Sequence, residues 1–167
     1  MKIAVLIEQK YEELEVWYPV YRLREAGHEV VMVAPEAGKT YLSKLGYPAT
    51  ADAAAKDVSA VDFAAVVIPG GFAPDYIRRS QDMLKIVRDA DAAKIPLAAI
   101  CHGPWVLCST QALKGRKVTG FHSIQDDVVN AGGTWVDAEV VVDGHVITSR
   151  TPADLPAFMK AVLQAIE

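Results

Sequence analysis

The sequence contains little cysteine and no excess of positive charge. Its 167 residues include two cysteines, and 17 lysine and arginine residues stand against 21 acidic ones, for a net charge of −4. Because the basic residues are scattered, we expect no nucleic-acid partner. Cys101 and Cys108 fall on one predicted helix, where their Cα atoms would be about 10 Å apart, beyond disulfide reach. We therefore predict free thiols and a reduced, cytoplasmic compartment.

Long hydrophobic runs and cofactor-binding motifs are also missing. The first apolar run, Ile3–Ile7, is too short to span a membrane, and no signal-peptide cleavage region follows it. Gly70-Gly71 lacks the dinucleotide fingerprint, no phosphate-loop motif is present, and the histidines show no metal-ligand spacing. We therefore expect no membrane association, no cofactor and no metal.

What is present is a regular alternation of strand and helix patterns. Apolar, β-branched runs predict strands at Ile3–Ile7, His28–Ala34, Phe63–Ile68, Pro96–Ile100 and within Val140–Ser149, where Asp143-Gly144 indicates a hairpin. Apolar residues at helical spacing predict three helices. The first contains Leu14, Trp17, Tyr18 and Tyr21 and ends at Gly27. The second contains Met83, Ile86, Val87 and Ala90, and the third contains Leu155, Phe158, Met159 and Val162. A small hairpin is expected between Glu36 and Asp57.

This βαβα order predicts a single α/β domain over residues 1–167. Half of the residues are apolar (51%), which is enough for a substantial core. Such alternation is typical of a mostly parallel sheet covered by helices on both faces. Functional groups in these folds lie at the carboxyl ends of the strands.

The run Pro96–Ile100 stops at Cys101-His102-Gly103-Pro104, which is typical of a nucleophile elbow. Glycine allows close backbone approach, and proline is preset for the first turn of a helix. A thiol at a helix N-terminus is expected to favour its thiolate form. The alternative is that Cys101 is a small buried hydrophobic residue. The adjacent His102 and the second glycine turn favour the catalytic or redox interpretation.

That second turn, Ile68-Pro69-Gly70-Gly71, ends another apolar run. A tight strand-to-helix connection alone would explain its glycines. Backbone N–H groups from this turn and from the elbow can also converge on a developing oxyanion. We expect Gly70 and Gly71 to shape this substrate-binding site, with the N–H groups of Gly71 and His102 as donors.

Several motifs together give the chain a family resemblance. They are Glu12-Glu13-Leu14-Glu15 followed by Pro19, Ile68–Gly71, Ala99–Pro104, Lys114–Lys117 and Ser149–Pro152. Over nearly its full length the chain resembles the PfpI-type intracellular proteases of the parkinsonism-associated deglycase and glutamine-amidotransferase-like superfamily. The resemblance implies a flavodoxin-like three-layer αβα sandwich and a homo-oligomer, either a dimer or a hexamer.

The resemblance also implies roles for individual residues. Cys101 would be the nucleophile, and Glu15 would point a protonated carboxyl at its sulfur, since two adjacent negative charges repel. Asp75 would orient His102 across a subunit interface. The proteases have glutamate at the position of Asp75 and tyrosine at that of Phe121. The aspartate is closer to the family's bacterial stress proteins, and both departures argue against a peptidase.

Three functions follow as hypotheses. The first is a cofactor-independent enzyme of stress protection that converts small dicarbonyls such as methylglyoxal to lactate, or acts on glycated proteins or peptides, in a glyoxalase III-like or deglycase-like reaction. The second is a PfpI-type cysteine peptidase that uses Cys101, His102 and Asp75. The third is a redox sensor or holdase chaperone without turnover, in which Cys101 is oxidised.

Overall fold

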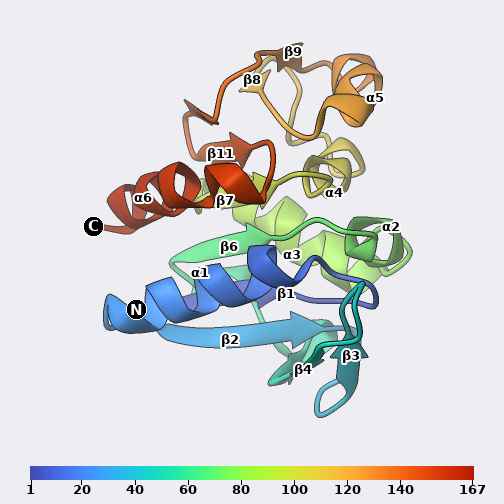
Figure 1. Cartoon of the computed structure of the whole chain (residues 1–167), viewed down its shortest axis with the longest axis vertical. Helices are drawn as coiled ribbons and strands as arrows, with labels where there is room; N and C mark the ends of the chain where they lie inside the picture. The colour runs from blue at the N-terminus through green and yellow to red at the C-terminus, as the bar shows by residue number, and fades with distance from the viewer.

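The computed structural model describes all residues from Met1 to Glu167. Its main sheet has seven strands in the order β10-β11-β7-β6-β1-β2-β5. Figure 1 labels β11, β7, β6, β1 and β2 at the centre of this order. The strands span β1 Lys2–Leu6, β2 Glu29–Ala34, β5 Ala53–Ala54, β6 Ala65–Ile68, β7 Leu97–Ile100, β10 Val140–Asp143 and β11 Val146–Ser149. All neighbours pair in parallel except β10 and β11, which form an antiparallel hairpin. The mostly parallel sheet predicted from the sequence is confirmed.

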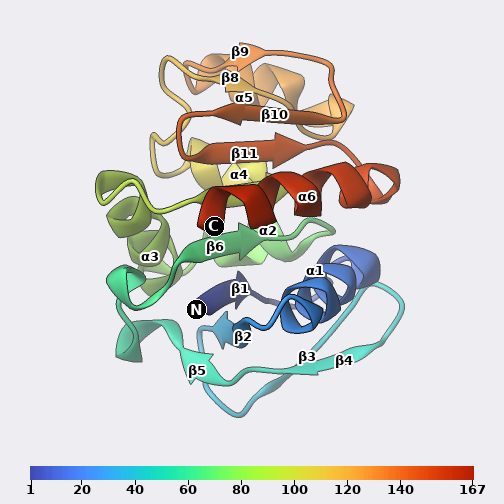
Figure 2. The ribbon, with the colours of Figure 1, turned by 90° about the vertical axis from the view of Figure 1, so that its left-hand side faces the viewer.

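Helices cover both faces of this sheet. The longer ones are α1 Glu13–Glu25, α3 Gln81–Ala92 and α6 Leu155–Ile166, and the shorter ones are α2 Ala73–Ile77, α4 Pro104–Cys108 and α5 Gln125–Asn130. Figure 2 shows α3 on one side of the sheet and α1 and α6 on the other. This is the flavodoxin-like three-layer αβα sandwich expected from the resemblance. None of the helices combines the length and apolarity needed to cross a membrane.

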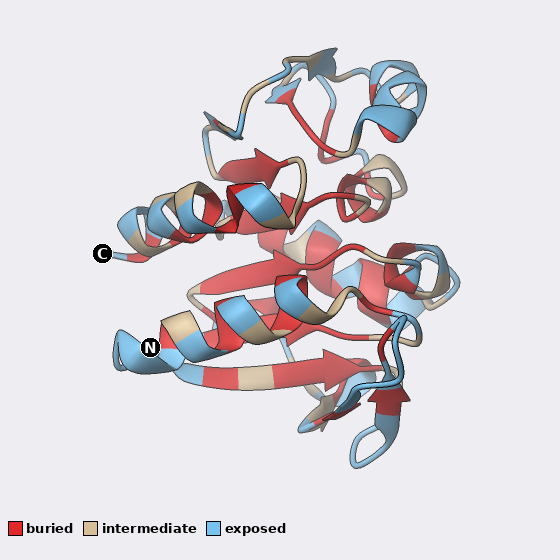
Figure 3. Cartoon of the chain, viewed as in Figure 1, coloured by how far each residue is buried: buried red, intermediate tan, exposed pale blue.

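The core lies between these layers, and every residue of β6, β7 and β11 is buried (Figure 3). Strands that are buried on both faces have continuous apolar sequences, which is why these strands could be predicted from the sequence. The apolar faces predicted for the two later helices are buried. They consist of Met83, Ile86, Val87 and Ala90 on α3 and of Leu155, Phe158, Met159 and Val162 on α6.

Helix α1 forms where expected, but it buries a different face. Leu14 and Tyr21 are more than half exposed, whereas Glu15, Val16, Pro19, Val20 and Leu23 are buried. The helix ends as predicted at Gly27, whose φ is +83°. The N–H groups of Gly27 and His28 donate to the Arg24 and Leu23 carbonyls, a glycine-terminated helix end.

The smaller strands lie outside the main sheet. The predicted hairpin between Glu36 and Asp57 is present as β3 Thr40–Leu42 paired with β4 Pro48–Thr50. β8 Lys117–Val118 and β9 Thr134–Trp135 form a second small pair, which the sequence patterns did not reveal. Strands this short carry too few residues for a recognisable alternation.

Candidate active site

Cys101 occupies a strained turn at the carboxyl end of β7. Its φ is +61°, a left-handed conformation that is uncommon for residues other than glycine. The Cys101 N–H donates to the Ser149 carbonyl at 3.0 Å, and its own carbonyl accepts from the Phe121 N–H at 2.8 Å. These bonds hold the turn that presents the thiol, as expected of a nucleophile elbow.

Gly103 lets the elbow pack against the sheet. A Cβ added there would lie 2.4 Å from the Ile68 carbonyl oxygen and 2.8 Å from that of Ile100. Pro104 is the first residue of α4, where its missing N–H has no cost. Cys101 itself lies in the turn, so the prediction that Cys101 and Cys108 share one helix is wrong. Both cysteines are free thiols.

The expectation that the helix end would favour the thiolate is also wrong. The pKa of the Cys101 thiol is raised, chiefly by burial and then, once Glu15 ionises, by the negative charge of that carboxylate. The backbone N–H groups of His102 and Gly71 lower this pKa, but their effect is smaller than that of burial. Helix α4 has only five residues, so its dipole is weak against the cost of burying a charge.

Glu15 is the buried carboxyl of this site. It is fully buried, and its Oε2 accepts a hydrogen bond of 2.7 Å from the Gly70 N–H. Oε1 is buried without a hydrogen-bond partner. Burial, followed by the charge of Glu12, raises the pKa of Glu15 to about 8. At neutral pH Glu15 is therefore mainly a neutral acid, able to donate to the Cys101 sulfur beside it.

Helix α1 positions this acid through its N-terminus. The Glu12 carboxylate accepts a 2.9 Å hydrogen bond from the Glu15 N–H, which caps the first turn. Glu15 then lies on the face of α1 that packs onto the sheet, next to Gly70. A charged residue type on a buried helix face is rare unless it is paired or functional.

The Pro69-Gly70-Gly71 turn closes around the same atoms. A Cβ added at Gly70 would lie 2.5 Å from Glu15 Oε2 and 2.8 Å from the Cys101 Cβ, so only glycine fits. The Gly70 N–H donates to Glu15 and so holds the acid; that Gly70 also shapes the substrate-binding site stays a prediction. Gly71 has a φ of +73°. Its backbone N–H group interacts with the Cys101 sulfur and lowers the pKa of that thiol.

His102 provides a proton acceptor beside the thiol. Its Nδ1 lies 3.3 Å from Cys101 Sγ, and its Nε2 lies 3.4 Å from Ser123 Oγ. The imidazole stacks on Phe121 and meets Trp105 edge to face. Burial, then the charges of Lys44 and His122, lower the pKa of His102, which keeps it neutral at pH 7. Ser123 was not identified from the sequence, where no motif marks it.

Asp75 lies apart from these groups within one chain. It is on α2, its carboxylate pairs with Arg79, and its side chain is about half exposed. It forms no hydrogen bond with His102 in the chain. The expectation that Asp75 reaches His102 across a subunit interface stays a prediction.

A pocket of about 250 Å³ opens over the thiol. Its walls combine charged groups with aromatic rings, and the lining residues are Glu12, Glu15, Lys44, Gly71, Phe72, Cys101, His102, Trp105, Phe121 and Pro152. No group of three or more His, Cys, Asp or Glu side chains is arranged to hold a metal ion.

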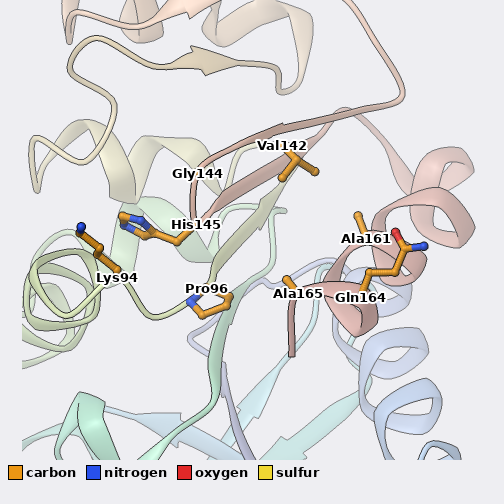
Figure 4. Close-up of a pocket in the computed structure, with 8 residues that line it drawn as sticks. All are labelled: Lys94, Pro96, Val142, Gly144, His145, Ala161, Gln164 and Ala165. Atoms are coloured by element: carbon orange, nitrogen blue, oxygen red, sulfur yellow. The ribbon is translucent and has the colours of Figure 1, made fainter. Parts of the chain in front are cut away.

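The largest pocket lies elsewhere and has different chemistry. It measures about 600 Å³ and lies beside the amino end of β7, among Lys94, Pro96, His145 and the end of α6 (Figure 4). No thiol or hydroxyl side chain lines it, and His145 Nε2 is held by Asp91 at 2.8 Å. The smaller pocket, with Cys101, is therefore the candidate active site.

Comparison with known proteins agrees with this architecture. The DJ-1/PfpI family model matches residues 1–165. The chain belongs to the DJ-1/PfpI family. Among curated relatives, Deglycase PH1704 of Pyrococcus horikoshii is 42% identical over 167 residues, with all of both chains covered. General stress protein 18 of Bacillus subtilis is 44% identical, covering 99% of this chain and 98% of the relative.

A solved structure of the DJ-1/PfpI family matches closely in shape. It is a two-domain protein of Anabaena variabilis that contains DJ-1/ThiJ/PfpI-like and ferritin-like domains. The TM-score is 0.96 at 42% identity, and the match covers 98% of this chain but 47% of the Anabaena chain. The likeness therefore concerns about half of that protein.

The buried Glu15 carboxyl should make the stability of this protein depend on pH. The folded chain holds a proton on Glu15 up to a pKa of about 8, whereas the ordinary value is 4.5. The native state thus binds more protons between these values, so stability falls as pH rises through this window. The free energy of unfolding should fall by up to about 1.4 kcal/mol per pH unit from this group.

Chemical denaturation at pH 5, 6, 7 and 8 checks this, with Glu15→Gln as the matched variant. The amide cannot titrate, so the variant should show a flatter dependence on pH than the wild type. Equal slopes for both proteins would contradict the assignment of a buried proton to Glu15.

Proposed function

We propose that this protein is a cysteine-dependent enzyme that acts on reactive dicarbonyls or on their protein adducts, in a glyoxalase III-like or deglycase-like reaction. The observation that carries the proposal is the position of Cys101 Sγ, which lies 3.3 Å from a neutral imidazole and next to a buried acid in a small pocket. The names of the relatives, a deglycase and a general stress protein, support the same class.

The first step would be addition of sulfur to the aldehyde. His102 takes the thiol proton through Nδ1, and the sulfur attacks the aldehyde carbon of methylglyoxal to give a hemithioacetal. The N–H groups of Gly71 and His102 stabilise the oxygen on which charge develops; one such donor is typically worth about 2.7–4 kcal/mol. A proton from His102 completes the hemithioacetal.

The later steps need only proton transfers and water. His102 removes the proton from the former aldehyde carbon, and a proton returns to the neighbouring carbon, which turns the adduct into a thioester of lactate. Water then cleaves the thioester, releasing lactate and regenerating the thiol. The ketone carbon is reduced while the aldehyde carbon is oxidised, so no external redox partner is consumed.

Because Glu15 is protonated, the Cys101 thiolate would be the only negative charge of the pair when it forms. While Glu15 is protonated, it adds no charge next to the sulfur and can donate a hydrogen bond to it. Once ionised, Glu15 would raise the pKa of the Cys101 thiol through its negative charge. The buried acid thus favours a transient thiolate without holding a permanent one.

This proposal is tested by product identity. Purified protein is incubated with methylglyoxal in a buffer without amines or thiols. Proton NMR follows the loss of methylglyoxal and the formation of lactate. We expect lactate to appear at the rate at which methylglyoxal is lost. Loss without lactate, or no loss above buffer alone, would reject the glyoxalase-like reaction; a glycated peptide then tests the deglycase-like one.

The alternatives fit the geometry less well. A peptidase of the PfpI type requires a carboxylate to orient His102, and within one chain Asp75 is paired with Arg79 instead. That reaction would depend on an assembled oligomer and would be lost in a diluted monomer. A redox sensor or holdase needs no proton acceptor beside its thiol, whereas His102 Nδ1 lies 3.3 Å from Cys101 Sγ, as turnover by a thiol nucleophile requires.

A further inference from the structure

One charged group in the active-site pocket has no role in the steps above. Lys44 lines the pocket together with Cys101 and His102. It comes from the connection between β3 and β4, which lies beside the N-terminus of α1. Its charge reaches the reacting groups, because it lowers the pKa of both Glu15 and His102.

The backbone around Lys44 is held in place by hydrogen bonds. The Lys44 N–H donates to the Tyr11 carbonyl at 2.9 Å. The next N–H, that of Leu45, donates to Glu13 Oε1 at 2.7 Å. Ser43, on the other side, is buried. These bonds fix the backbone of Lys44 beside the pocket, while the residue itself is exposed to solvent.

The ammonium group itself remains unpaired. Lys44 forms no ion pair within the chain. The three nearby glutamates are engaged by backbone N–H groups: Glu12 by that of Glu15, Glu13 by that of Leu45, and Glu15 by that of Gly70. Among the charged residues that line the pocket, Glu12, Glu15 and Lys44, only Lys44 therefore has no side-chain hydrogen bond within the chain.

We propose that Lys44 is a specificity-determining residue that binds a carboxylate on the substrate, so that the preferred substrates are 2-oxoaldehydes with a carboxylate remote from the aldehyde. This inference rests on the proposed function and names its substrate class. The aldehyde would meet Cys101, the aromatic walls would enclose the carbon chain, and Lys44 would hold the anionic end. A hydrogen bond to a charged group is worth about 1.5–3 kcal/mol, or about 10- to 100-fold in affinity.

Binding tests this without turnover. Cys101→Ser protein is titrated by NMR with 4-oxopentanoate, which carries a remote carboxylate, and with neutral pentan-2-one. Adding Lys44→Met should weaken 4-oxopentanoate binding about 10- to 100-fold and leave pentan-2-one unchanged. Lys44→Arg should retain most of the affinity. Lys160→Met on α6 removes the same charge from an exposed position and should have no effect.

Equal affinity of 4-oxopentanoate with and without Lys44 would overturn the inference. The kinetic counterpart compares 4,5-dioxopentanoate with methylglyoxal: the wild type should prefer the anionic compound in kcat/KM, and Lys44→Met should lose that preference. If neither 2-oxoaldehyde is turned over, the glyoxalase-like reaction fails, but the binding titration still decides the role of Lys44.

Discussion

Replacing Cys101 by serine is expected to lower methylglyoxal turnover by at least about 1,000-fold. A serine hydroxyl is a much weaker nucleophile than a thiol, and His102 at 3.3 Å from the sulfur would have to remove a far less acidic proton. The measurement is the rate of lactate formation by the variant and the wild type at the same oligomeric state.

Cys108→Ser is the matched control for that variant. Cys108 is also a free thiol, but it lies at the end of α4, outside the pocket, and burial raises its pKa to about 11. This variant should keep wild-type turnover. If Cys101→Ser retained the wild-type rate, Cys101 could not be the nucleophile.

Gly103→Ala is expected to destabilise the fold by about 3 kcal/mol. The added methyl group would lie 2.4 Å from the Ile68 carbonyl oxygen and 2.8 Å from that of Ile100, and both are backbone atoms of buried strands that cannot easily move. The elbow would have to move away from β6, taking Cys101 with it. The free energy of unfolding by urea measures this loss.

Gly46→Ala separates crowding from backbone strain. Gly46 has φ +88°, and a Cβ added there meets no atom within 4 Å. The substitution should cost only about 1 kcal/mol, from the unfavourable backbone conformation. Equal losses for the two variants would show that close packing at Gly103 does not hold the elbow against the sheet.

The sequence was most informative where the backbone itself is constrained. Gly70-Gly71 and Gly103-Pro104 are recognisable because only these residue types fit the close approaches and turns around Cys101. Continuous apolar runs identified the central strands for a similar reason, since β6 and β7 are buried on both faces. Local requirements of this kind leave a mark in the sequence.

Features that depend on tertiary packing were missed or misjudged. Ser123 and Lys44 approach His102 and the pocket from distant segments, and no local pattern marks either residue. On α1 the aromatic spacing suggested the wrong face, because this helix buries the acidic Glu15 while Tyr21 is exposed. The charge state of Cys101 was misjudged because burial outweighs a five-residue helix.

The most direct test of the account relates activity to the Cys101 thiol in the unmodified sequence. Wild-type protein is alkylated to different extents with iodoacetamide, and mass spectrometry gives the fraction of Cys101 and of Cys108 modified in each sample. The rate of lactate formation from methylglyoxal should fall in proportion to modified Cys101 and reach zero at complete modification. Activity that persists on fully alkylated Cys101, or that follows Cys108 instead, would contradict the account.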